Sequence, residues 1–181
     1  MNILARVVTA FIIGFGLDWM SKVRAEQTLD LHQPVPVIGE TFRFTLGYNT
    51  GVAFGLFSNN GVWPLVVTGI VILGLSVWFA HGIYRQEFSP RAGWAIGLVL
   101  SGALGNFIDR FFDGRVTDFL DVGLGSSRWP TFNLADSFIL IGLALLMLSE
   151  AQTPGEVSMS DPDVDEGEGM VSRSQTEFGN Q

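Results

Sequence analysis

The chain has 181 residues, of which 48% are hydrophobic and only 15% charged, a composition that points away from an ordinary soluble domain. Its formal net charge of −8 is concentrated in residues 151–181, and no basic patch suits nucleic acid. Because the sequence contains no cysteine, it excludes disulfides, thiolate nucleophiles and cysteine-ligated metals.

Four apolar stretches come close to the roughly 20 residues that a membrane-spanning helix requires. They cover residues 3–20, 62–81, 92–109 and 133–150. The second carries Pro64 in its first turn, where a helix tolerates proline. The third has small residues four apart, from Gly93 to Gly105, which lets helix backbones approach closely in lipid. We therefore predict an all-α polytopic membrane protein with four transmembrane helices in residues 1–152.

The first apolar stretch has a second interpretation, as a cleaved signal peptide. No convincing Ala-x-Ala site follows it, and its polar exit carries Asp18, Ser21 and Lys22. We therefore predict that this stretch is a retained membrane helix.

Short strand patterns occupy the connections between the apolar stretches. Residues 35–37 and 42–46 alternate as a half-buried strand does, and residues 115–122 are also strand-like. Asn49 and the Thr-Gly after it suit a turn. Residues 52–57 are apolar enough to lie at the membrane interface. Together these segments predict a small β-sheet cap on one face of the membrane.

The end of the chain differs from the rest. Residues 153–181 are rich in Gly, Ser, Asp and Glu, which predicts a disordered acidic tail. Orientation is harder to predict, because the two long loops hold six of the ten basic residues. A positive-inside count alone would place those loops in the cytoplasm.

Several hydrolytic chemistries find little support in the sequence. Histidine occurs only at His32 and His81, which this topology places on opposite faces, and no His-Glu-x-x-His motif is present. A serine nucleophile needs a base, but the adjacent Ser21 and Lys22 would point apart on a helix. We predict neither a metal nor a cofactor.

Carboxylates remain, and Asp118 and Asp136 stand out because ionised side chains within a membrane chain are costly. A loop can bring these two residues together, since they are eighteen positions apart. Two carboxyls in one partly dry site cannot easily both ionise, so the pair can hold a shared proton. One can then take a proton from water while the other protonates the peptide group.

Simpler interpretations stay open for these acids. Asn133 followed three residues later by Asp136 resembles a helix capping box, and Asp118 could be a solvated loop acid. Asp109 beside Arg110 suggests an interfacial ion pair. Interfacial, turn or loop positions would account for Asp18, Asn49, Asp113 and Asp121.

Five motifs follow one another through residues 1–150. They are Leu17-Asp18-x-x-Ser21-Lys22 and residues 48–55, 102–110, 114–119 and 132–137. Each motif alone is modest evidence, but the series in this order resembles the bacterial lipoprotein signal peptidases, the type II signal peptidases.

The resemblance implies an aspartyl endopeptidase of the bacterial inner membrane. Such enzymes remove signal peptides from diacylglyceryl-modified prolipoproteins and cut before the lipidated cysteine. By resemblance the catalytic pair is Asp118 and Asp136. The supporting residues would be Asp18, Asn49, Asn106, Arg110 and Asn133.

The family also implies a topology, which we adopt over the charge count. The sheet would be extracytoplasmic, the active site periplasmic and both termini cytoplasmic. We expect a monomer whose partners are prolipoproteins and membrane lipids, with no nucleic acid. Two rival functions are a proton relay in a small transporter and a structural assembly factor.

Overall fold

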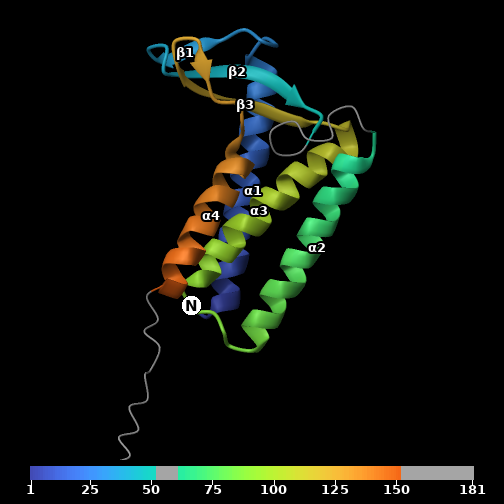
Figure 1. The fold of residues 1–181 in the computed structure, drawn as a ribbon, viewed down its shortest axis with the longest axis vertical. Coiled ribbons are helices and arrows are strands. Elements are labelled where there is room, and N and C mark those ends of the chain that lie inside the picture. Colours follow the sequence, from blue (N-terminus) through green and yellow to red (C-terminus); the bar gives the residue numbers. More distant parts are fainter. Residues whose placement is uncertain (52–60, 152–181) are drawn as a thin grey trace, which may run out of the picture.

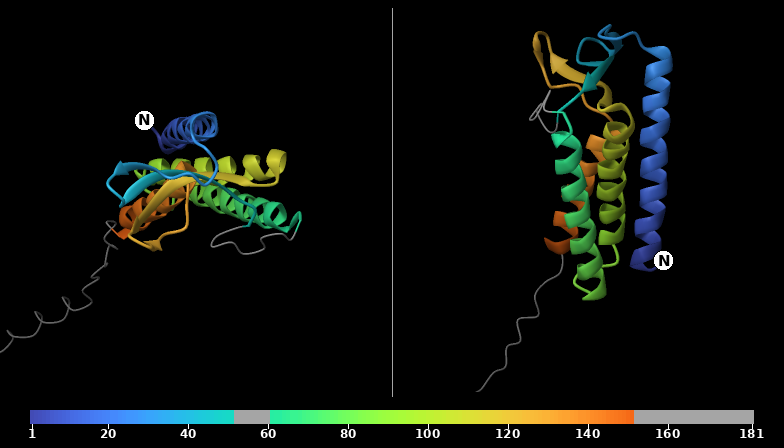
Figure 2. Two further views of the ribbon diagram at one scale, coloured as in Figure 1. Left: turned by 90° about the horizontal axis from the view of Figure 1, so that it is seen from above. Right: turned by 90° about the vertical axis from the view of Figure 1, so that its right-hand side faces the viewer.

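The structure is a computed structural model that describes residues 1–51 and 61–151, and its helices form a bundle with a small sheet across one end (Figure 1). The amino terminus and the α2–α3 connection lie at the opposite end (Figures 1 and 2). In chain order the elements are α1 (Ile3–Thr28), β1 (Val35–Ile38), β2 (Phe42–Asn49), α2 (Trp63–Tyr84), α3 (Ala92–Asp113), β3 (Val116–Leu124), β4 (Ser127–Arg128) and α4 (Leu134–Ala151).

Three of the helices, α1, α2 and α3, are long and apolar enough to cross a membrane. The apolar part of α4, Leu134–Ser149, is shorter than a typical span, so the structure supports three of the four predicted spans by this measure. Helix α1 runs eight residues past the predicted end, to Thr28. Good helix formers such as Arg24, Ala25 and Glu26 continue it beyond the apolar stretch.

Helix α3 is the centre of the bundle and packs against each of the other three helices. Its predicted stripe of small residues does pack against neighbours: Gly97 lies against the backbone of α1, and Gly102 against the Ala135 carbonyl of α4. A methyl group at either position would clash with backbone. Glycine therefore sets how closely α1 and α4 approach α3.

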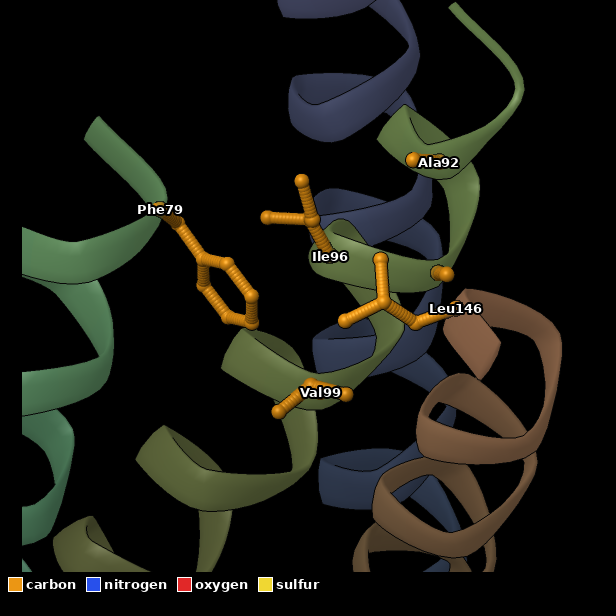
Figure 3. Close-up of a cluster of buried hydrophobic side chains, with 6 residues drawn as sticks. Phe79, Ala92, Ile96, Val99 and Leu146 are labelled. Carbon is orange, nitrogen blue, oxygen red and sulfur yellow. The ribbon is translucent and has the colours of Figure 1, made fainter. Parts of the chain in front are cut away.

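The apolar core surrounds the first turns of α3 (Figure 3), and these turns lie at the end of the bundle away from the sheet (Figure 1). Its buried members come from α2, α3 and α4: Phe79, Ala92, Ala95, Ile96, Val99 and Leu146. Most other large apolar side chains on the helices face outward, among them Ile70 and Met147, as expected for a lipid-facing surface.

The four strands form one antiparallel sheet in the order β1-β2-β3-β4. The predictions of strands at 35–37, 42–46 and 115–122 are confirmed, whereas the two-residue strand β4 was not predicted. In the β2–β3 pair, Gly47 lies opposite Asp118 after an irregularity in the register. Asn49 ends β2 and forms the predicted turn by accepting a hydrogen bond of 2.9 Å from the Gly51 N–H.

Two contacts attach the sheet to α1. Ala25 of α1 packs with Leu46 and Phe119 in a small apolar cluster. The Thr117 hydroxyl donates a hydrogen bond of 2.7 Å to Glu26. The predicted interfacial stretch at 52–57 and the predicted tail at 153–181 lie outside the described residues.

Candidate active site

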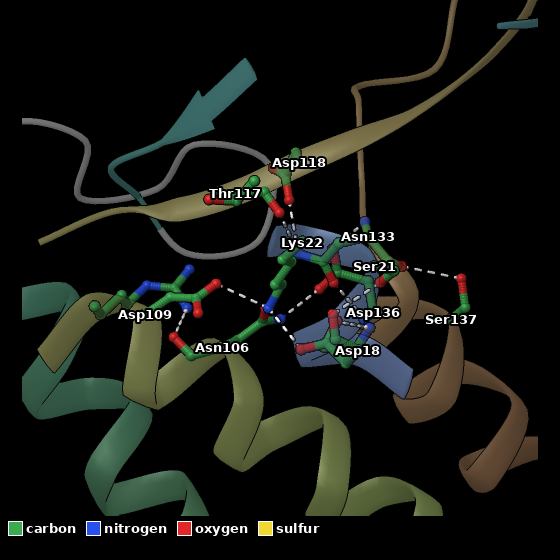
Figure 4. Close-up of polar contacts among 12 residues, drawn as sticks. Asp18, Ser21, Lys22, Asn106, Asp109, Thr117, Asp118, Asn133, Asp136 and Ser137 are labelled. Carbon is green, nitrogen blue, oxygen red and sulfur yellow. Dashed lines mark hydrogen bonds and ion pairs between the residues drawn. The ribbon is translucent and has the colours of Figure 1, made fainter. Parts of the chain in front are cut away.

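All seven predicted site residues take part in one network of polar contacts. They are Asp18 on α1, Asn49 at the end of β2, Asn106 and Arg110 on α3, Asp118 on β3, and Asn133 and Asp136 at the start of α4. Figure 4 labels Asp18, Asn106, Asp118, Asn133 and Asp136, where the sheet lies over the bundle. The turn between α3 and β3 depends on Gly114, whose φ of 68° is a left-handed conformation that favours glycine.

Asp136 is held by the start of its own helix. Its backbone N–H donates to Asn133 Oδ1 over 2.9 Å, and the Asn133 N–H donates to Asp136 Oδ2 over 3.3 Å. This reciprocal pair is a capping box, so the simpler interpretation of Asp136 is confirmed. The other carboxylate oxygen, Oδ1, accepts a hydrogen bond of 2.8 Å from Asn106 Nδ2. The capping role leaves that oxygen facing the polar cluster.

The side-chain amide of Asn133 bridges the two aspartates. While its oxygen caps α4 through the Asp136 N–H, its Nδ2 donates to Asp118 Oδ1 over 2.7 Å. Nδ2 also lies 3.1 Å from Asn106 Oδ1 and 3.3 Å from the Thr117 carbonyl oxygen. One buried asparagine thus contacts both carboxylates of the predicted pair.

Asp118 is buried, with only 3% of its surface exposed, so its interpretation as a solvated loop acid is wrong. Burial raises its pKa, and the neighbouring charge of Asp136 raises it further. Hydrogen bonds from Asn133 and Asn49 and the charge of Lys22 act in the opposite direction, and the pKa of Asp118 comes to about 7. Near neutral pH this carboxyl can therefore hold or release a proton.

Lys22 lies at the centre of the cluster (Figure 4). It was not among the site residues predicted from the sequence. Its ammonium is 2.8 Å from Asp18 Oδ2, 2.8 Å from Asp109 Oδ2 and 3.1 Å from Asn106 Oδ1. The prediction that Asp109 pairs with Arg110 is therefore wrong, because the ion-pair partner of Asp109 is Lys22. The signal for Lys22 was its spacing of four from Asp18, which places both on one face of α1.

Asp18 links α1 to α4. It is 1% exposed, which excludes the wet interfacial position considered for it. Its Oδ2 pairs with Lys22, and its Oδ1 accepts a hydrogen bond of 2.8 Å from the Ala135 N–H in the first turn of α4. That N–H has no partner within its own helix, so Asp18 supplies one.

Arg110 and Asn49 border the cluster. Arg110 donates from Nη1 to the Asn106 carbonyl over 3.0 Å and from Nη2 to the Gly51 carbonyl over 2.6 Å. Its Nε is buried and has no hydrogen-bond partner within residues 1–51 and 61–151. Asn49 hydrogen bonds Asp118 through its side chain.

The sequence suggested that Asp121 is an ordinary loop acid, and this interpretation is wrong. It is 4% exposed and lies on β3. Arg43 Nη2 contacts its Oδ2 at 2.8 Å, Arg128 Nη2 contacts its Oδ1 at 2.6 Å, and the Thr45 hydroxyl donates over 2.8 Å. Burial alone would raise its pKa, but these hydrogen bonds outweigh burial, and the pKa of Asp121 is lowered.

Fold and site together define the class: a helical membrane protein that holds a cluster of buried carboxylates beneath a small antiparallel sheet. Comparison with known proteins agrees. Residues 10–152 match the family described as signal peptidase (SPase) II. The chain belongs to this family and is a membrane peptidase, as the five sequence motifs predicted.

Individual relatives cover most of the chain. A lipoprotein signal peptidase of Teredinibacter turnerae is 42% identical over 135 residues, which are 72% of this chain and 78% of the relative. One from Brevibacillus brevis is 37% identical over 142 residues, or 78% of this chain and 91% of the relative. A solved structure described as a bacterial membrane enzyme has a TM-score of 0.71 and 26% identity, covering 93% of this chain and 99% of that chain.

Proposed function

We propose that the chain removes signal peptides from diacylglyceryl-modified prolipoproteins, cutting before the lipidated cysteine, with Asp118 and Asp136 as the catalytic carboxylates. Membership of the signal peptidase II family supports the reaction, and relatives named lipoprotein signal peptidase support the substrate. The observation that carries the assignment of the pair is the amide of Asn133, which hydrogen bonds Asp118 and caps the turn that holds Asp136.

The two carboxylates would divide the chemistry of amide hydrolysis. Asp118, with a pKa of about 7, carries the shared proton and gives it to the peptide carbonyl oxygen. Ionised Asp136 takes a proton from the attacking water, and the resulting tetrahedral diol forms without metal or covalent intermediate. As the C–N bond breaks, Asp136 gives its proton to the leaving amine, and a diol hydroxyl returns a proton to Asp118, so the pair regains its starting state. The oxygen of the added water is then in the product acid, and its two hydrogens are matched by those gained by the acid and the amine.

The supporting residues would hold the carboxylates and the substrate in place. Asn106 and Asn133 each donate to one aspartate, which fixes both carboxylate planes. Asn49 adds a donor to Asp118 from the sheet side. The buried Nε of Arg110 offers an N–H to a backbone carbonyl of the substrate. Asp18 fixes the first turn of α4.

We also propose a topology for residues 1–152 in the bacterial inner membrane. Helix α4 would be the fourth span, since its 18 residues would extend about 27 Å at 1.5 Å each. Sheet and site would face the periplasm and both termini the cytoplasm.

Because the chain lacks cysteine, a single introduced cysteine can report which side of the membrane its position faces. An impermeant maleimide should label Asp30→Cys in intact spheroplasts and Gln86→Cys only after permeabilisation; the reverse pattern would invert the topology.

We propose that residues 153–181 are an acidic cytoplasmic extension that catalysis does not need. Their composition suggests this, because they are low in apolar residues and high in acidic ones. Deletion of residues 155–181 should leave turnover per folded molecule unchanged. A large loss of specific activity would show that the extension contributes to the reaction.

One assay tests the catalytic pair. Purified protein in detergent with lipid receives a diacylglyceryl prolipoprotein, and cleavage is followed by gel shift. Asp118→Asn and Asp136→Asn should each lower turnover by about 10²- to 10⁴-fold, the usual contribution of a positioned acid or base. The exposed Asp30→Asn is the matched control and should cleave normally. Full cleavage by either site variant would refute the assignment of the pair.

A further inference from the structure

Two donor groups determine how the amides of the cluster are turned. The first is the backbone N–H of Asp136, which needs an acceptor and takes Asn133 Oδ1 at 2.9 Å. The Nδ2 of Asn133 must therefore point into the cluster, toward Asp118 Oδ1 at 2.7 Å and Asn106 Oδ1 at 3.1 Å. Helix α4 itself thus fixes the orientation of Asn133.

The second donor group is the ammonium of Lys22. It has three N–H donors and three acceptors: Asp18 Oδ2 at 2.8 Å, Asp109 Oδ2 at 2.8 Å and Asn106 Oδ1 at 3.1 Å. Lys22 is only 4% exposed, and its partners come from both α1 and α3. An ammonium cannot accept a hydrogen bond, so whichever Asn106 atom faces it must be an acceptor.

Asn106 is therefore constrained from two sides. Its Oδ1 accepts from Lys22 and from Asn133, and its Nδ2 donates to Asp136 Oδ1 at 2.8 Å. If the amide were rotated by half a turn, an N–H₂ would meet two donors and an oxygen would meet a carboxylate. All three contacts would become repulsive.

We propose that Lys22 is a positioning residue for peptide hydrolysis, which fixes the Asn106 amide in the one orientation that presents an N–H to Asp136. This inference rests on the proposed function, because it assumes that Asp136 is a catalytic carboxylate. Within the described residues Lys22 forms no hydrogen bond or ion pair with Asp136 or Asp118, so it acts through the amide.

A charge-balanced variant tests the role of Lys22. Lys22→Met alone would leave Asp18 and Asp109 buried with no cation, and it could fail to fold for that reason. Lys22→Met/Asp109→Asn removes one positive and one negative charge together, so the local net charge is kept. Loss of a hydrogen bond that orients a group next to a charge should lower kcat by about 10- to 100-fold, with KM within about twofold. Wild-type kcat would refute the proposal.

A matched residue separates the lost hydrogen bond from the lost charge. Glutamine has about the length of methionine but retains an N–H donor for Asn106 Oδ1. Lys22→Gln/Asp109→Asn should therefore have a higher kcat than Lys22→Met/Asp109→Asn when both rates are expressed per folded molecule. Equal rates for the two would refute the proposal. The exposed Arg24→Met, on the same helix, controls for the loss of a cation and should cleave normally.

A double-mutant cycle tests whether Lys22 acts through Asn106. In an Asn106→Ala background, Lys22→Met/Asp109→Asn should lower kcat by less than about threefold more, because the amide that Lys22 orients is gone. Effects that multiply would show that Lys22 acts by another route. Failure of this cycle differs from failure of the proposed function, since in the latter case Asp136→Asn itself would cleave normally.

Discussion

Strand β3 carries two buried aspartates three residues apart, and their surroundings differ in the groups that donate to them. Asp121 receives two guanidinium groups, from Arg43 and Arg128, and its pKa is lowered. Asp118 receives only amides, lies near the charge of Asp136, and its pKa is raised to about 7. At similar solvent exposure, the same residue type is held as an anion in one place and can keep a proton near neutral pH in the other.

The difference lies in the cations as well as in how deeply each carboxyl lies, since burial is the largest cause that raises the pKa of Asp118. The nearby ammonium of Lys22 is already shared by Asp18, Asp109 and Asn106, so it lowers the pKa of Asp118 only through space. A buried carboxylate without a direct cation keeps its proton more easily. We interpret Asp121 as part of the scaffold of the sheet and Asp118 as part of the chemistry.

The largest expected effect is the contrast in turnover between the two positions. Asp118→Asn should lower kcat by about 10²- to 10⁴-fold, whereas Asp121→Asn should stay within about threefold of wild type per folded molecule. The kcat of each variant is measured in the prolipoprotein cleavage assay, and the folded fraction of each is measured in parallel. Equal losses at both positions would remove the contrast between the two aspartates.

The second effect is a gain of stability in Asp118→Asn. Its folded pKa of about 7 lies above the ordinary 3.8, so the proton favours the folded state below the ordinary pKa, and this stabilisation is lost as pH rises through about 7. Asp118→Asn has no carboxylate to bury. At about pH 8 it should be more stable than wild type by up to roughly 4 kcal/mol, and at about pH 4 by almost nothing.

Thermal unfolding midpoints in detergent, measured across this range, test that prediction. The comparison uses wild type and Asp118→Asn in the same detergent and lipid. A constant difference in midpoint between acid and alkaline pH would show that Asp118 does not change its proton affinity on folding.

The third effect has the opposite sign at Asp121. Because its folded pKa is lowered, its stabilising contribution is present above the ordinary pKa and is lost as pH falls through the folded value. Asp121→Asn leaves Arg43 and Arg128 without their carboxylate and should lower the free energy of unfolding near neutral pH. The loss should shrink in acid. Chemical or thermal unfolding that shows a gain at neutral pH would contradict the ion-pair role.

The smallest effect concerns the glycines that let α3 approach α1. A Cβ at Gly105 would lie 2.5 Å from Asp18 Oδ2, so Gly105→Ala must displace that carboxylate and should cost about 1–3 kcal/mol. Gly16 on α1 has open space around it and is the matched control. Gly16→Ala should stabilise by about 0.5–1 kcal/mol. Midpoints that change equally for the two variants would show that Gly105 is not needed for close packing.

Local patterns predicted much of this molecule. The apolar stretches gave the helices, alternation gave three strands, and the spacing of Asn133 and Asp136 gave the capping box, because each signal lies within a few residues. The end of α1 was missed because the helix continues to Thr28 after its apolar residues stop.

Pairings between distant residues could not be predicted in the same way. Lys22 meets Asn106 across 84 positions, and Arg43 meets Asp121 across 78. A single sequence holds no signal for such contacts, so Lys22 was not placed among the site residues and Asp121 was interpreted as a loop acid. The family motifs supplied the residues of the network; the structure added which atoms face one another.

The most direct test is the titration of the Asp118 carboxyl itself. Infrared difference spectra of wild type against Asp118→Asn, recorded across pH in detergent with lipid, isolate the C=O band of the protonated acid. The band should be present in mild acid and half lost near pH 7. A band that is already gone by about pH 5, as for an ordinary aspartic acid, would contradict the shared-proton assignment of Asp118 and Asp136.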